Sequence, residues 1–570
     1  MNGLVMMIIA IVFLGGAYLI YGRYLAKKWG IDPKAKTPAY EMEDGVDYVP
    51  ADTNVVFGHQ FASIAGAGPI NGPIQAAIFG WVPVLLWILL GGVFFGAVQD
   101  FAAMYASVKN KGRSIGYIIE IYIGSLGKKL FLLFTWLFSI LVVAAFADIV
   151  AGTFNGFTAD TGAKIEANGS VAMTSMLFIV FAVTLGFYTK YTHFNKAVNT
   201  IVAIFLLVIA VALGLLFPIF IHQKAWLLFV YAYVMIACIT PVWALLQPRD
   251  YLNSYLLVAM IAGAVIGIIV YNPSIHMAAF KGMEVNGSYL FPTLFVTIAC
   301  GAVSGFHSLV SSGTASKQIK NEKNMLPISF GAMLLESLLA VTALIAVAAL
   351  ATSDGLPTGT PPQVFAKAIA MFLTKLGLSE NVTFTLITLS VSAFALTSLD
   401  SVARVGRIAF QELFTNDAVE NKKAGIVRRV LTDKYFATMI TLVLCYSLSV
   451  VGYANIWPLF GSANQLLSAL SLIACAVYLK KTKRQGFMLW GPMVIMLAVT
   501  FTALSLKIKT IAAMFLAHDG SFSAGRDGLQ FVFAILLLIL GLIVAVEGIK
   551  MLLKKTEDQE SDQELKKEIA

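Results

Sequence analysis

Long apolar runs follow one another along almost the whole chain. Each is about 20 residues long, the length at which an α-helix crosses the hydrocarbon core of a bilayer. The sequence predicts fifteen such spans, at 4–21, 57–80, 82–107, 129–152, 171–188, 197–220, 226–246, 252–271, 290–313, 326–351, 382–407, 435–452, 456–478, 487–507 and 528–553. Only 12% of the residues are charged, against about 25% in a soluble domain. The chain is therefore predicted to be an all-α polytopic membrane protein.

Lysine and arginine are concentrated in every second loop between these spans. The basic loops are 22–56, 108–128, 189–196, 247–251, 314–325, 408–434 and 479–486. Because basic loops stay on the cytoplasmic side, the N-terminus is expected outside and the C-terminus inside. The formal net charge of +9 is attributed to this topology, and no nucleic-acid partner is expected. Arg23, Lys27 and Lys28 follow the first span without a small-residue cleavage site, so this span is expected to be retained rather than removed as a signal peptide.

The stretch GHQFASIAGAGPINGP, residues 58–73, is unusual at bilayer depth. Gly66, Gly68 and Gly72 allow the backbone to unwind, and Pro69 and Pro73 lack N–H donors. Irregular backbone is tolerated in a membrane only where it is buried in protein or lines a cavity. We therefore expect a broken helix at 57–80. A kinked helix that packs closely through its small residues is the alternative.

A second stretch, SGFHSLVSSGT at 304–314, resembles the first. His59 and His307 are 248 positions apart, and Asp148 and Asp400, each in the sequence D-x-V-A, are 252 positions apart. The span with the second stretch comes seven spans after the span with the first, an odd number, so the two sets of spans would be inverted. The predicted division is a span and loop at 1–56, a first repeat at 57–220, two intervening spans at 221–289, a second repeat at 290–478, two spans at 479–553 and a disordered tail at 554–570.

Paired interrupted helices in inverted halves point to the substrate site of a secondary transporter. A broken helix exposes N–H groups that attract an anion such as a carboxylate, and C=O groups that can coordinate a cation. The candidate substrate-binding residues are His59, Gly66, Gly68, Asn71, Ser304, His307 and Ser311. The serines are also consistent with close helix packing, and a lone membrane His is more often a satisfied hydrogen-bonding group.

Ionisable side chains within spans are costly and are functional candidates by default. Asp148, Glu336 and Asp400 are candidates for coupling transport to a cation or a proton. Thr397 and Asp400 fall on one helical stripe, and a hydroxyl beside a carboxylate suits a cation. A structural ion pair between Asp400 and Arg404 is the alternative.

Other polar residues within the spans are assigned different roles. Asp100 is expected to cap or snorkel near the inner end of its helix. Arg249 and Asp250, at the inner face after the span 226–246, are candidate gate residues. Asn464 and Gln465 are either gate or packing elements. The four cysteines lie in apolar runs without metal-ligand spacing, so no metal, disulfide or other cofactor is expected.

The motifs FGHQFASIAGAGPINGP, GAVQDF, TPVWALLQPRDY, CGAVSGFHSLVSSGT, FALTSLDSVARVGR and IWPLFGSANQLLSAL occur in this order between about residues 50 and 480. Together they resemble the carbon starvation protein A family of bacterial inner-membrane transporters. The resemblance implies the five-plus-five inverted repeat of the amino acid–polyamine–cation superfamily, with peptides, or in some relatives pyruvate with protons, as substrates. It also implies a cation site formed by the backbone from Ala62 to Gly66 with Thr397, Asp400 and Ser401. The two spans between the repeats depart from this plain core.

The predicted function is a secondary active transporter that imports peptides during carbon starvation, coupled to H⁺ or Na⁺. Proton-coupled pyruvate uptake is the alternative, and a channel or a membrane-bound starvation sensor is a remote one. An enzyme is not expected, because HExxH, GxSxG and paired Cys/His spacings do not occur. A Walker A motif is missing too, so ATP is not the expected driver. The expected partners are the substrate, the coupling ion and the lipid of the bacterial inner membrane, and the sequence indicates no oligomeric state.

Overall fold

The computed structural model describes residues 2–44, 48–122, 124–158, 161–191, 196–240, 245–352, 355–414, 426–484, 486–517 and 522–554. Within the helices, the side chains at 189–190, 196–197, 199, 246–248, 250–251 and 254 lie outside the described part.

The described residues form helices and one short hairpin, β1 (Glu284–Val285) and β2 (Ser288–Tyr289). The α-helices are α1 (Gly3–Ala17), α2 (Arg23–Trp29), α3 (Pro38–Glu41), α4 (Thr53–Ile64), α5 (Gly68–Ala76), α6 (Trp81–Gly91), α7 (Val98–Lys109), α8 (Ile115–Tyr122), α9 (Ser125–Thr153), α10 (Glu166–Tyr191), α11 (Lys196–Leu216), α12 (Gln223–Ile239), α13 (Leu246–Tyr271), α14 (Leu290–Thr297), α15 (Gly305–Gly313), α16 (Ala332–Leu350), α17 (Pro361–Leu373), α18 (Glu380–Leu413), α19 (Ile426–Thr432), α20 (Lys434–Ser449), α21 (Tyr453–Lys481), α22 (Phe487–Leu516) and α23 (Leu529–Leu553). Nine helical segments among these residues are long and apolar enough to cross a membrane. The predicted all-helical membrane class is confirmed.

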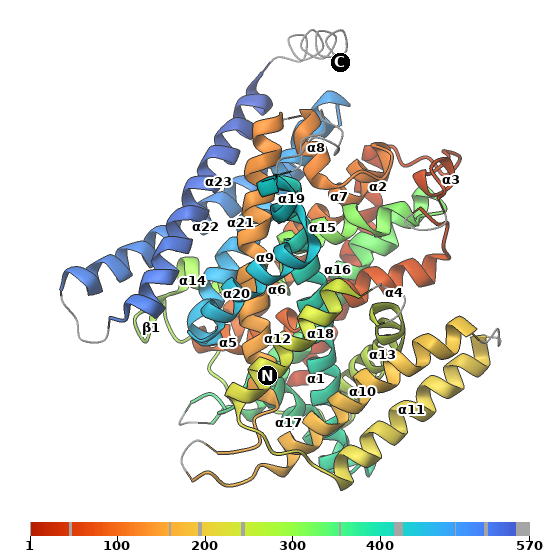
Figure 1. Ribbon diagram of the computed structural model, residues 1–570, viewed down its shortest axis with the longest axis vertical. Helices are drawn as coiled ribbons and strands as arrows, with labels where there is room; N and C mark the ends of the chain where they lie inside the picture. Colours follow the sequence, from red (N-terminus) through yellow and green to blue (C-terminus); the bar gives the residue numbers. More distant parts are fainter. Residues whose placement is uncertain are drawn as a thin grey trace.

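Three helices form the centre of the molecule. The most apolar stretch of α21 is completely buried, and those of α9 and α18 are 83% buried, whereas that of α23 is only 44% buried. A helix that is apolar all round belongs in such a centre, and α9 and α18 pack along each other there. Figure 1 shows α22 and α23 at one margin of the molecule and the α10–α11 pair at the opposite one.

The loops gather at two ends of the helix bundle. At one end, Ala51 pairs with Ile319, and Lys320 forms an ion pair with Asp52 at 2.6 Å. At the other end, the Gly3 N–H donates to the Pro273 carbonyl at 2.7 Å. The two contacts at the first end join loops expected on the cytoplasmic side, and the contact at the other end joins segments expected on the outside.

Helix α17 lies between the predicted spans 326–351 and 382–407, in a segment expected to be an outer loop. It begins with a capping box formed by Thr360 and Gln363, and with two prolines in its first turn. Most of its residues are buried, and it packs against α13, α16 and α18. Its 13 residues are too few to span a bilayer, so hydropathy alone does not reveal it.

Candidate functional site

The first interrupted helix breaks between α4 and α5. Residues 65–67 separate the two halves, and the Ala65 torsion angles of φ −76° and ψ 56° are not helical. A Cβ atom at Gly66 would lie 2.4 Å from Ser398 Oγ, and one at Gly68 would lie 2.5 Å from Cys300 Sγ. Neither neighbour leaves room for a side chain, because α18 and the second break approach the backbone closely here.

The second interrupted helix breaks between α14 and α15, with residues 298–304 between the halves. It lies directly against the first. A Cβ atom at Gly72 on α5 would lie 2.8 Å from the Thr297 carbonyl oxygen at the end of α14. On the other halves, Gln60 of α4 donates to Ser311 Oγ of α15 at 2.8 Å. Both interruptions fall within the spans for which the sequence predicts them.

Helix α21 holds both halves of the second interrupted helix in place. The Trp457 indole donates to the Thr297 carbonyl at 3.1 Å, and the Gln465 amide donates to the Phe295 carbonyl. Asn464 Oδ1 accepts from the Phe306 N–H at the start of α15, at 3.2 Å. These side chains satisfy backbone groups that the broken helix leaves without intrahelical partners. Asn464 and Gln465 therefore act as packing elements in this conformation.

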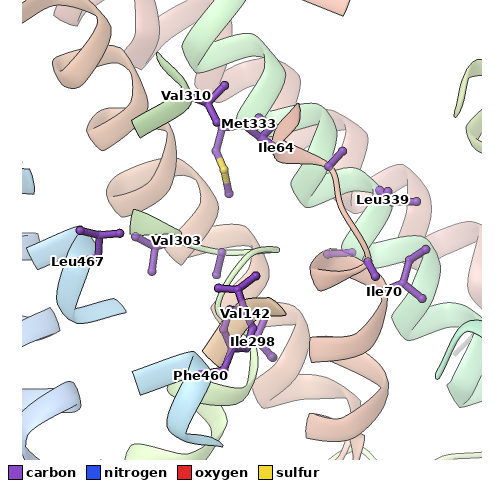
Figure 2. Close-up of a cluster of buried hydrophobic side chains, with 14 of the residues drawn as sticks. Ile64, Ile70, Val142, Ile298, Val303, Val310, Met333, Leu339, Phe460 and Leu467 are labelled. Carbon is purple, nitrogen blue, oxygen red and sulfur yellow. The ribbon is translucent and has the colours of Figure 1, made fainter. Parts of the chain in front are cut away.

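A small cavity lies where the two breaks meet α9, α18 and α21. It is lined by Ile64, Gly66, Gly68, Phe138, Val142, Phe146, Cys300, Phe306, Ser398, Val402, Phe460 and Asn464. None of these lining residues is charged. The cavity volume of about 20 Å³ is close to the room that one water molecule needs, so the described conformation is closed around it. Figure 2 shows Ile64, Val142, Ile298 and Phe460 in the buried apolar cluster that surrounds the breaks.

The predicted substrate-binding residues do not all reach this cavity. Gly66 and Gly68 line it. His59 on α4 lies with its Nε2 atom 3.3 Å from Thr314 Oγ1, directly after α15. Ser311 on α15 accepts a hydrogen bond from Gln60 on α4. Both residues therefore connect α4 to the α15 half of the second interrupted helix. Ser304 exchanges hydrogen bonds with the amide of Asn464, a cavity-lining residue.

Asn71 on α5 is different. It is completely buried, and neither atom of its side-chain amide has a hydrogen-bond partner among the described residues. A buried polar group without a partner is costly, so an asparagine here calls for an explanation.

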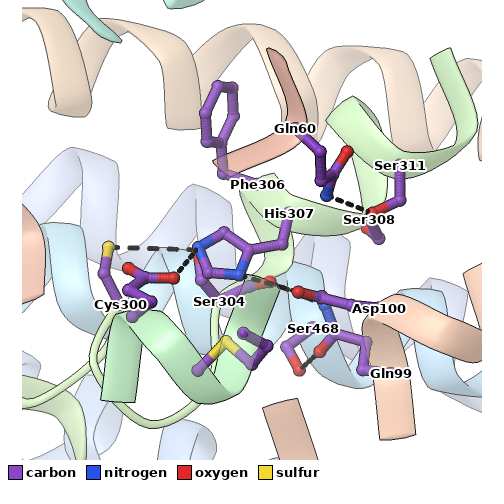
Figure 3. A network of polar contacts seen from close by, with 12 residues as sticks. Gln60, Gln99, Asp100, Cys300, Ser304, Phe306, His307, Ser308, Ser311 and Ser468 are labelled. Atoms are coloured by element: carbon purple, nitrogen blue, oxygen red, sulfur yellow. Dashed lines mark hydrogen bonds and ion pairs between the residues drawn. The ribbon is translucent and has the colours of Figure 1, made fainter. Parts of the chain in front are cut away.

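Three ionisable side chains meet beside the second break, and we call Asp100, His307 and Glu336 the His307 cluster. His307 Nδ1 lies 3.1 Å from Asp100 Oδ2, and His307 Nε2 lies 3.3 Å from Glu336 Oε2. The first contact is a hydrogen bond, whereas the second has the distance of an ion pair but not the geometry of a hydrogen bond. All three side chains are completely buried. Figure 3 shows His307 facing Asp100, with Gln99 and Ser468 beside them.

The expected role of Asp100 as a cap or snorkelling residue is wrong. Its carboxylate is buried against α15, and α7 continues for more than two turns beyond it, to Lys109. The sequence feature that indicates a buried Asp100 is its position within a long apolar run, next to Gln99. The Gln99 amide likewise donates a hydrogen bond to another segment, at the Ser304 carbonyl.

A second buried group consists of Tyr233, Arg249 and Asp400, which we call the Arg249 cluster. The Arg249 guanidinium binds both carboxylate oxygens of Asp400, with one contact at 3.2 Å, and the Tyr233 hydroxyl lies 3.1 Å from Asp400 Oδ2. Arg249 and Asp400 are each 1% exposed.

Arg249 is buried in the first turn of α13, and its place at the inner face stays a prediction. One alternative for this region is corrected. Asp400 pairs with Arg249 rather than with Arg404, which instead donates to the Ala237 and Thr240 carbonyls at the end of α12. The side chain of Asp250 lies outside the described residues.

The remaining coupling candidates lie apart from the His307 cluster. Asp148 accepts from the Tyr453 N–H at 2.7 Å and from Gln223 Nε2 at 2.8 Å, so it caps the start of α21. Thr397 accepts from Asn253 Nδ2 at 2.6 Å. Ala62 is buried on α4, and Ser401 is half-buried on α18.

Comparison with known proteins gives consistent matches. The model of the family "Carbon starvation protein CstA" matches residues 2–357 and 353–503. The chain is 31% identical to "Peptide transporter CstA" of Bacillus subtilis, covering 96% of this chain and 97% of the relative. It is 32% identical to "Pyruvate/proton symporter BtsT" of Escherichia coli, covering 86% of this chain and 80% of the relative.

Two solved structures are also similar. A manganese transporter from Eremococcus coleocola has a TM-score of 0.43 at 11% identity, covering 88% of this chain and 94% of that one. MhsT in complex with L-phenylalanine has a TM-score of 0.45 at 12% identity, covering 88% and 99%. The family match and the identities to full-length relatives show that the chain belongs to the carbon starvation protein CstA family.

Proposed function

We propose that this protein is a secondary active transporter that imports peptides across the bacterial inner membrane during carbon starvation. The observation that carries the proposal is the meeting of two interrupted helices around a cavity in the buried centre. Discontinuous helices at the middle of a membrane protein are typical of substrate sites in secondary transporters. The peptide transporter named among the relatives supports the substrate class.

The proposed architecture has fifteen spans and a five-plus-five inverted repeat. The first repeat would run from α4 to α11 and the second from α14 to α21. Asp148 and Asp400 would then occupy corresponding helices, α9 and α18, which pack along each other. Alternating access would arise when the interrupted helices rock against the rest of the molecule.

In this proposal the substrate carboxylate binds near the start of α5. That helix begins at Gly68, beside the cavity, and the Gly68 N–H precedes the first hydrogen bond of the helix. Pro69 has no N–H, and the Ile70 and Asn71 N–H groups donate to the Ala67 carbonyl, so Gly68 is the backbone donor offered to the carboxylate. Asn71 lies one turn further along, with an amide that can both donate and accept. Substrate binding would supply the hydrogen bonds that the Asn71 amide lacks in the closed conformation.

Proton-coupled uptake of pyruvate is the second candidate function. It is favoured by the lining of the cavity, where the residues contribute amide, hydroxyl and thiol groups but no charge. The ammonium group of a peptide would find no carboxylate among these lining residues, whereas pyruvate has only a carboxylate and a ketone. The name of the second relative supports this candidate.

The Arg249 cluster bears on the choice of coupling ion. The resemblance to the family implies a cation beside Thr397, Asp400 and Ser401, but the Arg249 guanidinium already binds the Asp400 carboxylate. A sodium ion at Asp400 would have to displace this guanidinium. We therefore propose a proton as the coupling ion, and a gate function for Arg249, which joins α13 to α18.

Counterflow in proteoliposomes tests the transport function and the substrate class together. Vesicles loaded with unlabelled alanyl-alanine or unlabelled pyruvate are diluted into the same labelled compound. Labelled dipeptide should exchange into the dipeptide-loaded vesicles if the leading proposal is right, and labelled pyruvate into the pyruvate-loaded ones if the second is right. Exchange of neither compound, by protein that remains folded, would contradict both proposals.

A further inference from the structure

The His307 cluster brings three ionisable side chains from three different helices into complete burial. We propose that this cluster carries the coupling proton and that Glu336 is the group that gains and loses it. This inference rests on the transport function proposed above. The proton would come from water on one side of the membrane, bind a carboxylate oxygen of Glu336 and leave to water on the other side, with no other bond changed.

The contacts distinguish Glu336 from Asp100. Asp100 is hydrogen-bonded to His307 Nδ1 at 3.1 Å. Neither carboxylate oxygen of Glu336 has a hydrogen-bond partner among the described residues, and the surrounding turns of α16 are apolar except for Ser337, whose hydroxyl donates to the Met333 carbonyl. A buried carboxylate without hydrogen bonds is far less costly in its neutral, protonated form. Glu336 is therefore the acid that holds a proton in this closed conformation.

The charges of the cluster change by one unit when that proton moves. An imidazolium with two carboxylates has a net charge of −1, and one further proton makes the cluster neutral. A net charge is costly in a buried environment, so the neutral state suits the closed conformation. The titratable groups that face Glu336 are Asp100 from α7, His307 from α15 and the Cys300 thiol from the break. Contact with water would favour release of the proton.

The position of the cluster connects proton binding to the substrate cavity. His307 lies on α15, one half of the second interrupted helix, and Glu336 lies on α16, which packs against α5. Cys300, which faces Glu336, also lines the cavity. Loss of the proton would leave Glu336 negatively charged and strengthen its attraction to an imidazolium at His307. This attraction would change the packing of α15 against α16.

Two local features of the neighbouring helices support this role. A π-helical turn, η3 (Gly92–Ala97), precedes the part of α7 that carries Asp100, and another, η6 (Leu326–Gly331), precedes the part of α16 that carries Glu336. Such turns occur frequently at functional sites.

Buried hydroxyl groups continue from the cluster toward the end of the bundle that holds the basic loops. Ser308 and Ser471 share a hydrogen bond of 2.7 Å, and Ser107 donates to Ser316 Oγ at 2.8 Å. These side chains are completely buried. They provide polar groups between the cluster and the basic loops that a proton leaving toward the cytoplasm would need.

Substitution of Glu336 tests the proposal in proteoliposomes made with the full-length chain. Glu336→Gln mimics the protonated acid permanently, and Glu336→Asp keeps the titratable group. Ser337→Ala is the matched control, since the hydrogen bond of this neighbouring hydroxyl to a described residue stays within α16, at the Met333 carbonyl, 3.1 Å away. Labelled alanyl-alanine and labelled pyruvate are the probes, and a trapped pH-sensitive dye reports proton influx.

We expect Glu336→Gln to retain counterflow and to lose both accumulation driven by a proton gradient and substrate-induced proton influx. Ser337→Ala should retain all three activities. Proton-driven accumulation by Glu336→Gln would overturn the inference and leave the transport function standing. So would a wild-type protein that accumulates its substrate only with a sodium gradient.

If Glu336→Gln also loses counterflow, Glu336→Asp decides the question. Recovery of proton-coupled uptake by Glu336→Asp supports the inference, and no recovery overturns it in favour of a structural role. A wild-type protein that exchanges neither probe would overturn the transport function itself, and the inference with it.

Discussion

At the scale of single residues, the Arg249 cluster combines two opposite charges that are almost completely buried. Arg249 binds both carboxylate oxygens of Asp400, and this paired geometry compensates for the cost of removing both groups from water. Substitution of one partner of such a pair costs more stability than replacement of both, because the remaining charge stays buried without an opposite charge. The same pair joins α13 to α18, so it can act as a gate only if its partners separate at some stage of transport.

Asp400→Asn should therefore destabilise the folded protein. Removal of one partner of a buried ion pair costs about 3–5 kcal/mol, so we expect a lower melting temperature for the detergent-solubilised protein. Arg249→Gln should have a similar effect. The double variant should lose less stability than the sum of the losses of the two single variants. Additive losses in this double-mutant cycle, followed by thermal unfolding, would show that the two side chains do not stabilise each other.

Asn71 presents the reverse case, a buried polar side chain without hydrogen-bond partners in the part of the chain that the structure describes. Replacement of such a group by an apolar one of similar shape removes a desolvation cost of about 1–3 kcal/mol. Asn71→Leu should therefore raise the melting temperature while it lowers substrate uptake. A variant with reduced stability and unchanged uptake would assign Asn71 to the packing of α5 instead of to the substrate.

At the scale of helices, the second break depends on how closely α21 approaches it. A Cβ atom at Gly461 would lie 1.8 Å from the Val296 carbonyl oxygen, and one at Gly305 would lie 2.4 Å from Leu467 Cβ. Only glycine allows these helices to come together. The indole and amide groups of α21 can then reach the carbonyl groups of α14.

Gly461→Ala should displace α14 from α21. Overpacking of a close contact costs about 1–3 kcal/mol and sometimes more, and the hydrogen bonds from Trp457 and Gln465 would be strained as well. We expect a clear loss of thermal stability and of uptake. Gly15→Ala is the control, because a Cβ atom at this exposed position in α1 meets nothing within 4 Å. Equal melting temperatures for the two variants would contradict this account of the α14–α21 contact.

The sequence predicts features that depend on local chemistry. Glycine and proline mark the first interruption, and glycine and serine mark the second, because backbone freedom is a property of the residues themselves. The partners of buried charges are not local. Asp400 and Arg249 are 151 positions apart, and His307 and Asp100 are 207 positions apart. Helical spacing offers Arg404 as a partner for Asp400, whereas the true partner, Arg249, comes from another helix. It offers Glu336 no partner in its own turn, which indicates a protonated acid or a pair with another helix without identifying His307 as that partner.

At the scale of the whole molecule, the arrangement of loops leads to a prediction about topology. Arg113 and Lys281 are both exposed, and they lie in loops expected on opposite sides of the membrane. In a background without native cysteines, an impermeant maleimide should label Arg113→Cys only from the cytoplasmic side and Lys281→Cys only from the outside. Labelling of both positions from one side would contradict the predicted topology.

The molecule as a whole combines two interrupted helices, an uncharged cavity and two buried charge clusters around one centre. Each feature alone has a structural explanation, since glycine contacts permit packing and ion pairs join helices. Their concentration around α5, α15 and α18 is what a transporter with alternating access requires, because the substrate site and the coupling site must respond to the same movement.

Concentrative transport coupled to protons is measured by uptake of labelled alanyl-alanine and labelled pyruvate into proteoliposomes under an imposed proton gradient, with an imposed sodium gradient for comparison. We expect one of these compounds to accumulate above its equilibrium level, only when the proton gradient is present, and a protonophore to abolish the accumulation. Uptake that only equilibrates the compound, whichever gradient is imposed, would show that the protein is not a proton-coupled transporter of either compound.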